Sequence, residues 1–105
     1  MEPSIHLTLR NVTLESVHQI LSESRLPFAE NDNYSTAEIP SSLSNVCKRF
    51  RFGHVDYCGI NIRTQICELA ENLVITFSIA EMKKEKILEF LDYVEMIFVP
   101  WRVEE

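Results

Sequence analysis

Two neighbouring stretches in which apolar and polar residues alternate constrain the fold of this chain more than any other feature. Within residues 59–69, isoleucine or threonine occupies every second position from 60 to 66, with polar residues between. Residues 73–80 repeat this period of two, which is typical of strands with one buried face. Asn72 ends the three-residue connection between them, and asparagine tolerates the left-handed conformation of a tight turn. The sequence therefore predicts a β-hairpin.

A strand and a helix are predicted before this hairpin. Residues 4–10 alternate in the same way, which predicts a half-buried strand. Thr13 has the character of a helix N-cap, and Glu15 falls in the first turn, where the helix dipole favours an acid. Apolar residues then recur at helical spacing, and Pro27 stops the helix near residues 24–26.

The longest predicted helix follows the hairpin and covers residues 81–98. Leu88 and Phe90 widen its apolar stripe, and Pro100 ends it. Residues 101–103 predict a short final strand at a sheet edge, where proline is tolerated.

The middle of the chain carries weaker patterns. Residues 30–45 are rich in Asn, Asp and Ser with few apolar residues, which predicts a loop. Residues 41–50 overlap its end, and their apolar spacing favours a short helix with Pro40 near its start. Charged and aromatic residues then alternate, so a further strand is expected to begin near Arg49.

The order of these elements indicates an α+β domain over residues 1–105, with an antiparallel sheet and two main helices packed on one face. That order resembles a ferredoxin-like, split βαβ layout. A chain of 105 residues fits one hydrophobic core and no second one.

Charge and hydropathy exclude several classes of function. The formal net charge is −6, so a phosphate backbone or an anionic membrane is repelled by the average field of the molecule. The longest apolar runs are three or four residues, far short of the roughly 20 that a spanning helix needs. The N-terminus lacks the pattern of a secretory signal, so a cytoplasmic location is expected.

The three cysteines, Cys47, Cys58 and Cys67, are predicted to be reduced thiols, because their number is odd and their spacing is not that of a paired motif. A zinc site would need His54 and Cys58 together with two more ligands. No metal or cofactor is expected. A calcium site in the loop would need the regular acid spacing of an EF-hand, which is missing.

Two further chemistries remain as alternatives. Lys48, Arg49 and Arg51 are interleaved with two phenylalanines, a pattern that can stack and neutralise single-stranded nucleic acid. Three charges form a small footprint in a chain of net charge −6, so nucleic-acid binding is not predicted.

An enzymatic alternative uses the next residues of the same strand. His54, Asp56 and Cys58 alternate and would share one face, which supplies a nucleophile, a base and an orienting acid. No nucleophile motif surrounds Cys58, and the expectation is that the chain is not an enzyme.

The acids of the last helix point to binding. Glu89, Asp92 and Glu95 recur every third residue, although neighbouring acids repel and the C-terminal end of a helix prefers a basic residue. Carboxylates with a nearby aromatic suit a basic protein partner, and the acidic loop offers a second such surface. The candidate partner-binding residues are Glu89, Asp92, Glu95, Trp101, Tyr34 and Asp32.

These features predict a small acidic protein that binds and occludes a basic protein surface. In size, charge and lack of a catalytic motif the chain is similar to immunity proteins and antitoxins, and that similarity implies inhibition of a basic partner such as a toxin nuclease. The alternative is a homodimeric adaptor or chaperone-like subunit.

Overall fold

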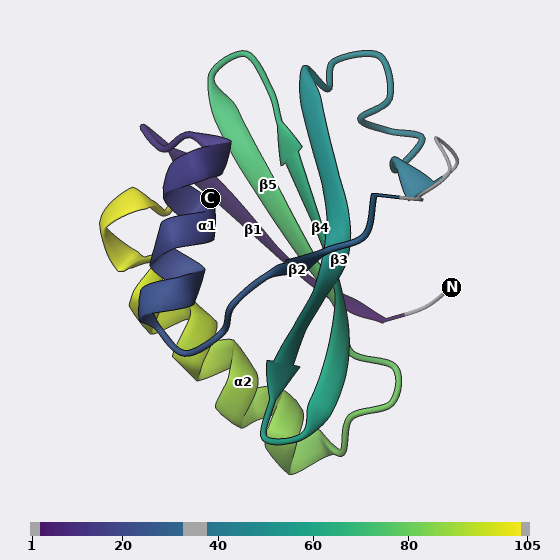
Figure 1. Cartoon of the computed structure of the whole chain (residues 1–105), viewed down its shortest axis with the longest axis vertical. Helices are drawn as coiled ribbons and strands as arrows, with labels where there is room; N and C mark the ends of the chain where they lie inside the picture. Colours follow the sequence, from purple (N-terminus) through teal and green to yellow (C-terminus); the bar gives the residue numbers. More distant parts are fainter. Residues whose placement is uncertain (1–2, 33–37, 104–105) are drawn as a thin grey trace.

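In the computed structural model, which describes residues 3–32 and 38–103, the predicted hairpin forms the middle of a five-stranded sheet (Figure 1). Its strands are β4 (Ile60–Glu68) and β5 (Asn72–Ser78), and the Leu69 N–H donates to the Asn72 carbonyl oxygen at 2.8 Å. The other elements, in chain order, are β1 (Ser4–Arg10), α1 (Leu14–Glu23), β2 (Ala29–Glu30), β3 (Arg49–Tyr57), α2 (Lys84–Ile97) and a 3-10 helix (Val99–Trp101).

The strands lie in the order β1-β5-β4-β3-β2, and every described pair is antiparallel. Both helices cover the same face of the sheet (Figure 1), which confirms the α+β class. The topology differs from the expected split βαβ layout. A βαβ unit joins two parallel strands, whereas β1 lies at the sheet edge and pairs antiparallel with β5.

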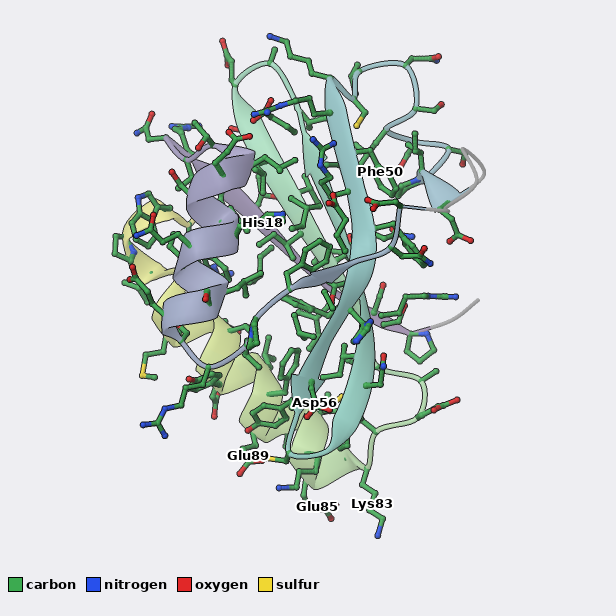
Figure 2. The ribbon with its side chains drawn as sticks, viewed as in Figure 1. His18, Phe50, Asp56, Lys83, Glu85 and Glu89 are labelled. Carbon is green, nitrogen blue, oxygen red and sulfur yellow. The ribbon has the colours of Figure 1, made fainter. Side chains whose placement is uncertain are left out.

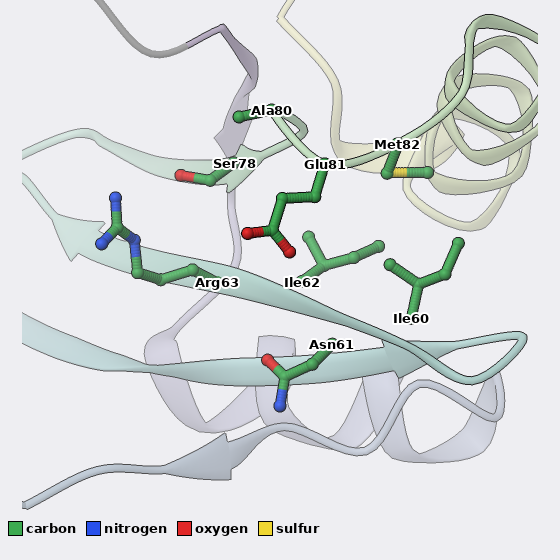
Figure 3. Close-up of a pocket in the computed structure, with 8 residues that line it drawn as sticks. All are labelled: Ile60, Asn61, Ile62, Arg63, Ser78, Ala80, Glu81 and Met82. Carbon is green, nitrogen blue, oxygen red and sulfur yellow. The ribbon is translucent and has the colours of Figure 1, made fainter.

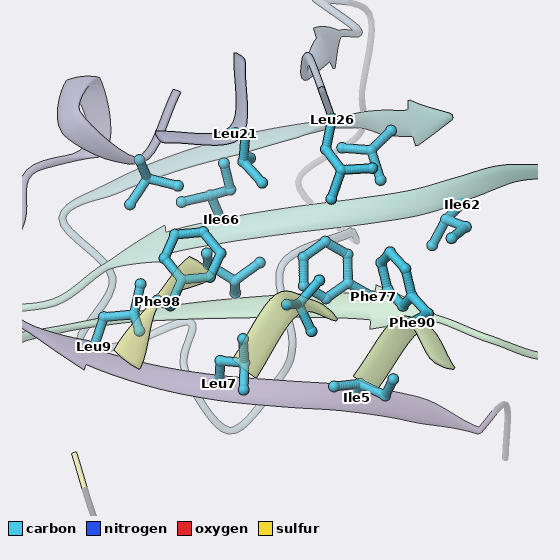
Figure 4. Close-up of a cluster of buried hydrophobic side chains, with 14 of the residues drawn as sticks. Ile5, Leu7, Leu9, Leu21, Leu26, Ile62, Ile66, Phe77, Phe90 and Phe98 are labelled. Atoms are coloured by element: carbon cyan, nitrogen blue, oxygen red, sulfur yellow. The ribbon is translucent and has the colours of Figure 1, made fainter. Parts of the chain in front are cut away.

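The hydrophobic core lies between the sheet and the two helices (Figure 4). The alternation that predicted the strands determines which side chains enter it, because Ile62 and Ile66 on β4 are buried beside Phe77 on β5. Phe90 from α2 meets Phe77 edge to face, with ring centroids 5.1 Å apart. This contact fixes the inner side of α2 against the sheet.

Helix α1 begins and ends as its sequence predicts. The Thr13 hydroxyl oxygen accepts a hydrogen bond from the Ser16 backbone N–H at 3.1 Å, which satisfies one of the free donors of the first turn. The helix ends at Glu23, within two residues of the expected stop. Val17 and Leu21 are buried on its inner side.

Helix α2 is shorter than expected, because it begins at Lys84 rather than at residue 81. Met82 is buried, and its N–H donates to the Ile79 carbonyl oxygen at 3.0 Å, so a turn precedes the helix. The prediction for Leu88 was wrong. Phe90 is buried, but Leu88 points away from the core and remains 54% exposed.

Strands β3 and β4 are joined by a two-residue turn that the sequence analysis did not identify. Cys58 and Gly59 both have positive φ, 52° and 80°, as in the type I′ turns that match strand twist. The Asp56 carboxylate accepts a hydrogen bond from the Gly59 N–H at 3.0 Å. Asp56 therefore stabilises the turn.

The middle of the chain is organised by turns. Strand β3 begins at Arg49, as predicted, but the short helix expected before it is replaced by turns. These include hydrogen bonds from the Leu43 N–H to the Pro40 carbonyl and from the Cys47 N–H to the Leu43 carbonyl, both 2.9 Å. One isolated helical turn lacks the propagation that stabilises longer helices.

Both edges of the sheet are partly covered. Arg102 forms a single bridge with Leu9, and the Val103 N–H donates to the Thr8 carbonyl oxygen at 2.9 Å, where a short edge strand was expected. At the opposite edge β2 crosses Gly53 so closely that a Cβ there would lie 2.1 Å from the Ala29 carbonyl oxygen. Gly53 is thus required for β2 to pair with β3.

Candidate functional site

Three large apolar side chains are exposed on α2 and on the 3-10 helix that follows it. Leu88, Met96 and Val99 are 54%, 61% and 63% exposed. Leu88 and Met96 are two helical turns apart on one side of α2, and Val99 begins the 3-10 helix just beyond its end. Among the described residues only Val46 is a comparably exposed large apolar side chain.

Acidic residues lie between and beside these apolar side chains. Asp92 occupies the turn between Leu88 and Met96, and it is exposed. Glu85 and Glu89 project from the N-terminal half of α2, at the lower rim of the molecule in Figure 2. We call the surface formed by the following residues the α2 outer face: Leu88, Asp92, Met96 and Val99, with Glu85, Glu89 and Glu95 beside them.

Two of the three predicted acids have partners within the chain. Glu89 forms an ion pair with Lys86 at 3.0 Å and a hydrogen bond with the Tyr57 hydroxyl, and these contacts, Lys86 first, lower the pKa of its carboxyl. Glu95 pairs with Arg102 at 2.7 Å. Both pairs are solvent-exposed, and such pairs contribute little to stability. The carboxylates therefore remain accessible to an external cation.

Local helix physics does not explain this arrangement of charges on α2. The helix has no side-chain N-cap, and Lys83 and Lys84 lie at its start, where the dipole favours acids. Its last turn has no basic residue, although Asp92 and Glu95 lie in its C-terminal half. Glu85 in the first turn follows the helix dipole, whereas the two lysines at the start and the acids of the C-terminal half oppose it.

The other predicted binding residues do not join this surface. Trp101 is half-buried and packs on the core, where it lines a depression with Val12 and Ile20 on the α1 side. Asp32 is exposed in the turn after β2, an edge strand of the sheet. Tyr34 lies outside the described residues. The five described candidates therefore do not form one surface.

The basic and aromatic residues of β3 lie on opposite faces of the sheet, as strand alternation requires. Phe50 is buried on the face away from the helices, while Arg49 contacts Glu15 at the start of α1. Arg51 pairs with Glu30 of β2 at 2.8 Å. The pattern that suggested nucleic-acid binding is thus divided between two faces, and its two arginines are paired internally.

Arg49 is the centre of a charge network that joins three elements. Its guanidinium donates to both Glu68 oxygens at 2.8 Å and to Glu15 at 2.6 and 3.0 Å. Glu68 also accepts the Leu14 N–H of α1 at 3.3 Å. Hydrogen bonds from Arg49 hold the pKa of both carboxyls below the usual range, and the carboxylates raise the pKa of Arg49. This network ties α1 to β3 and β4.

The residues of the enzymatic alternative are not assembled as the sequence predicted. His54 and Asp56 share one face of β3, but Cys58 lies in the turn beyond the strand and is exposed. Asp56 accepts the Gly59 N–H within that turn. No group of three or more His, Cys, Asp and Glu side chains capable of holding a metal occurs within residues 3–32 and 38–103.

The depressions of the described surface are small or open. One of about 200 Å³ lies between β4 and the segment after β5 (Figure 3), with Arg63 and Glu81 among its lining residues. That volume is below the roughly 300–1,000 Å³ of common ligand pockets. A larger one, about 740 Å³, lies beside the start of α1, where the Glu68 carboxylate already occupies the helix N-terminus.

Sequence reasoning missed Leu88, Met96 and Val99 as surface residues. Their positions carried a signal, because Asp92 lies one turn from both Leu88 and Met96 and therefore marks that side of the helix as solvent-facing. The inner side is defined by Phe90 and Val94, which are buried.

Comparison with known protein families, with curated proteins and with solved structures finds no match for this chain. Among the described residues, no helix combines the length and apolar character needed to cross a membrane.

Proposed function

We propose that the chain is a non-catalytic protein-binding domain of the cytoplasm, and that its α2 outer face binds a basic segment of another protein. The observation that carries this proposal is that Leu88 and Met96 are exposed beside acidic residues on one side of α2, with Val99 exposed just beyond the end of the helix. Monomeric proteins seldom expose contiguous apolar surface unless it is used for interaction.

The two kinds of residue would have different roles. Leu88, Met96 and Val99 supply the area that leaves water on binding, and methionine adapts easily to the shape of a partner. The carboxylates of Glu89, Asp92 and Glu95 steer a basic partner and accelerate encounter. The partner segment is expected to combine Lys or Arg with apolar residues at helical spacing.

Occlusion of a basic surface is the mechanism by which such a domain would act as an inhibitor. A partner whose function depends on a basic site, such as a nuclease, would lose access to its anionic substrate while that site is covered. The acidic chain, with net charge −6, suits this role.

Affinity capture from lysate of the source organism tests the proposal when matched variants are compared. Glu89→Lys/Asp92→Lys/Glu95→Lys removes the acids of the α2 outer face. Asp32→Lys/Glu71→Lys/Glu81→Lys changes net charge equally at exposed positions elsewhere. We expect a basic protein that elutes at high salt from the wild type and from the second variant, but is absent with the first. Equal capture by both variants would contradict the proposed surface.

A homodimer is the second candidate, and the charge polarity of α2 favours it. Lys83, Lys84 and Lys86 lie near the start of the helix, and Asp92 and Glu95 lie in its second half. Antiparallel pairing of two copies would bring opposite charges together across a symmetric interface. Sedimentation distinguishes the two functions, because a dimer that persists below micromolar concentration supports the homodimer and a monomer supports the binding of another protein.

A further inference from the structure

Residues 38–48, which precede β3, are joined to β4 by hydrogen bonds at both ends. The Gln65 side-chain amide donates to the Glu38 carbonyl oxygen at 2.9 Å, and the Lys48 N–H donates to the Glu68 carbonyl oxygen at 2.7 Å. Phe50 and Cys67 are partners in the β3–β4 register, and they are only 4% and 2% exposed. The two ends of residues 38–48 are therefore attached to β4, and Phe50 and Cys67 are buried beside them.

Two of the three cysteines meet where this segment joins the sheet. A turn directs Cys47 back toward the strands, and its thiol donates to the Arg49 carbonyl oxygen at 3.3 Å. The Lys48 N–H bonds to the Glu68 carbonyl oxygen, and this places Cys47 and Cys67, the residues that precede these two, close together beside the start of β3. Burial, and then the contact with Cys47, raises the pKa of the Cys67 thiol to about 12. Cys47 is half-buried, so solvent reaches the pair from its side.

We propose that Cys47 and Cys67 form a reversible disulfide that fastens residues 38–48 to the sheet. The oxidant is a small disulfide such as oxidised glutathione. The Cys47 thiolate attacks one sulfur of this disulfide, forms a mixed disulfide and releases one glutathione thiolate. Cys67 then gives up its proton and attacks the Cys47 sulfur, which releases the second glutathione. The pair loses two protons and two electrons, and the oxidant takes them up to become two thiols.

Exposure and acidity determine the order of these two attacks. Cys47 is the more accessible thiol, so it meets the oxidant first. Cys67 is buried, and its raised pKa keeps it protonated at neutral pH. The second step should therefore accelerate as pH rises.

The third cysteine provides an internal control. Cys58 lies in the turn after β3, whereas Cys47 lies just before that strand begins. A nine-residue strand separates them, which is a span of roughly 30 Å. Cys58 is exposed and cannot reach either of the other two thiols without unfolding.

The test is incubation of the Cys58→Ser chain with oxidised glutathione, followed by mass spectrometry of the intact protein and of its peptides. We expect loss of two hydrogens, a peptide pair linking Cys47 to Cys67, and reversal by dithiothreitol. The melting temperature should rise by about 10 °C, because the bond closes a loop of some 20 residues. The matched variant Cys47→Ser/Cys58→Ser differs from the first only at the half-buried residue 47, and it should show none of these effects.

Three results would overturn the proposal. The Cys58→Ser chain could remain reduced, could stop at a glutathione adduct on Cys47, or could form only disulfides between chains. Any of these would mean that the two thiols do not reach bonding geometry in the folded protein.

Discussion

Helices α1 and α2 cover the same face of the sheet, but they differ in the capping of their N-termini and in the side chains that they expose to solvent. Helix α1 has a side-chain cap from Thr13, an acid in its first turn, and a salt-bridge network through Arg49. Helix α2 also has an acid, Glu85, in its first turn, but it has no side-chain cap and carries lysines at its start. The exposed positions of α1 are polar, whereas α2 exposes Leu88 and Met96.

This difference separates a helix whose charges are satisfied within the chain from one to which we assign binding in the proposed function. A helix whose ends and charges are satisfied within the chain has its role in the fold. A helix that departs from the same rules, and exposes apolar area as well, has features that another molecule can use. The predictions below test this distinction, from the largest expected effect to the smallest.

The inner side of α2 should be essential to the fold while its outer side is not. Phe90→Ala removes the ring that packs on Phe77 and Tyr57, and we expect a loss of about 3–5 kcal/mol in the free energy of unfolding. Leu88→Ala, two residues away and exposed, should change it by less than about 0.5 kcal/mol. Urea denaturation measures both, and a large loss for Leu88→Ala would contradict the assignment of that face.

The charge network of α1 should contribute to stability in a pH-dependent way. Glu68→Gln weakens the contacts with Arg49 and the Leu14 N–H, and we expect a loss of about 1.5 kcal/mol at pH 7.

The sign of the pH effect follows from the lowered pKa of Glu68. Its contribution is complete above the ordinary carboxyl value of 4.5 and disappears as pH falls through the lowered value in the folded state. Wild type and Glu68→Gln should therefore converge in stability below about pH 4.5. A difference that stays constant down to pH 2 would show that the network is not the cause.

The cap of α1 should be measurable by itself. Thr13→Ala removes the acceptor of the Ser16 N–H and should lower the free energy of unfolding by about 1 kcal/mol. Thr13→Ser keeps the hydroxyl and serves as the control. Equal losses for both variants would mean that the methyl group, rather than the hydrogen bond, carries the effect.

The start of α2 should respond in the opposite direction. Lys83 is the N-cap residue and makes no capping hydrogen bond, so Lys83→Ser should increase the free energy of unfolding by about 0.5 kcal/mol. A thermal melt beside Thr13→Ala compares the two helix ends directly. A loss of stability on adding the cap would mean that Lys83 has a structural contact of its own.

Local patterns in the sequence predicted the secondary structure more reliably than the long-range arrangement. Alternation in β4 and β5 identified the hairpin and its buried residues, because period-two patterning depends only on which face is buried. The strand order was not accessible in the same way. Placement of β1 beside β5 depends on packing between residues almost 70 positions apart, about which local periodicity says nothing.

The candidate site was predicted in part. The acids Glu89, Asp92 and Glu95 lie on or beside the outward side of α2, and their spacing showed this in advance. Two features of the site could be seen only in the structure. Trp101 packs toward α1, and Glu95 already pairs with Arg102, because the chain turns back after the helix at Val99–Trp101. Leu88 was assigned to the core because it is apolar and lies next to the apolar stripe of the helix. The spacing of apolar residues does not show how far around the helix the buried side extends.

The central claim is that the α2 outer face is an interface, and a binding titration tests it most directly. A partner recovered by capture is titrated with wild type, with Leu88→Ser/Met96→Ser/Val99→Ser, and with Val46→Ser, which removes an exposed apolar side chain in the segment before β3. Loss of each buried apolar anchor should cost on the order of 1 kcal/mol or more, so the triple variant should bind at least 100-fold more weakly. Val46→Ser should bind like wild type, and unchanged affinity of the triple variant would contradict the account.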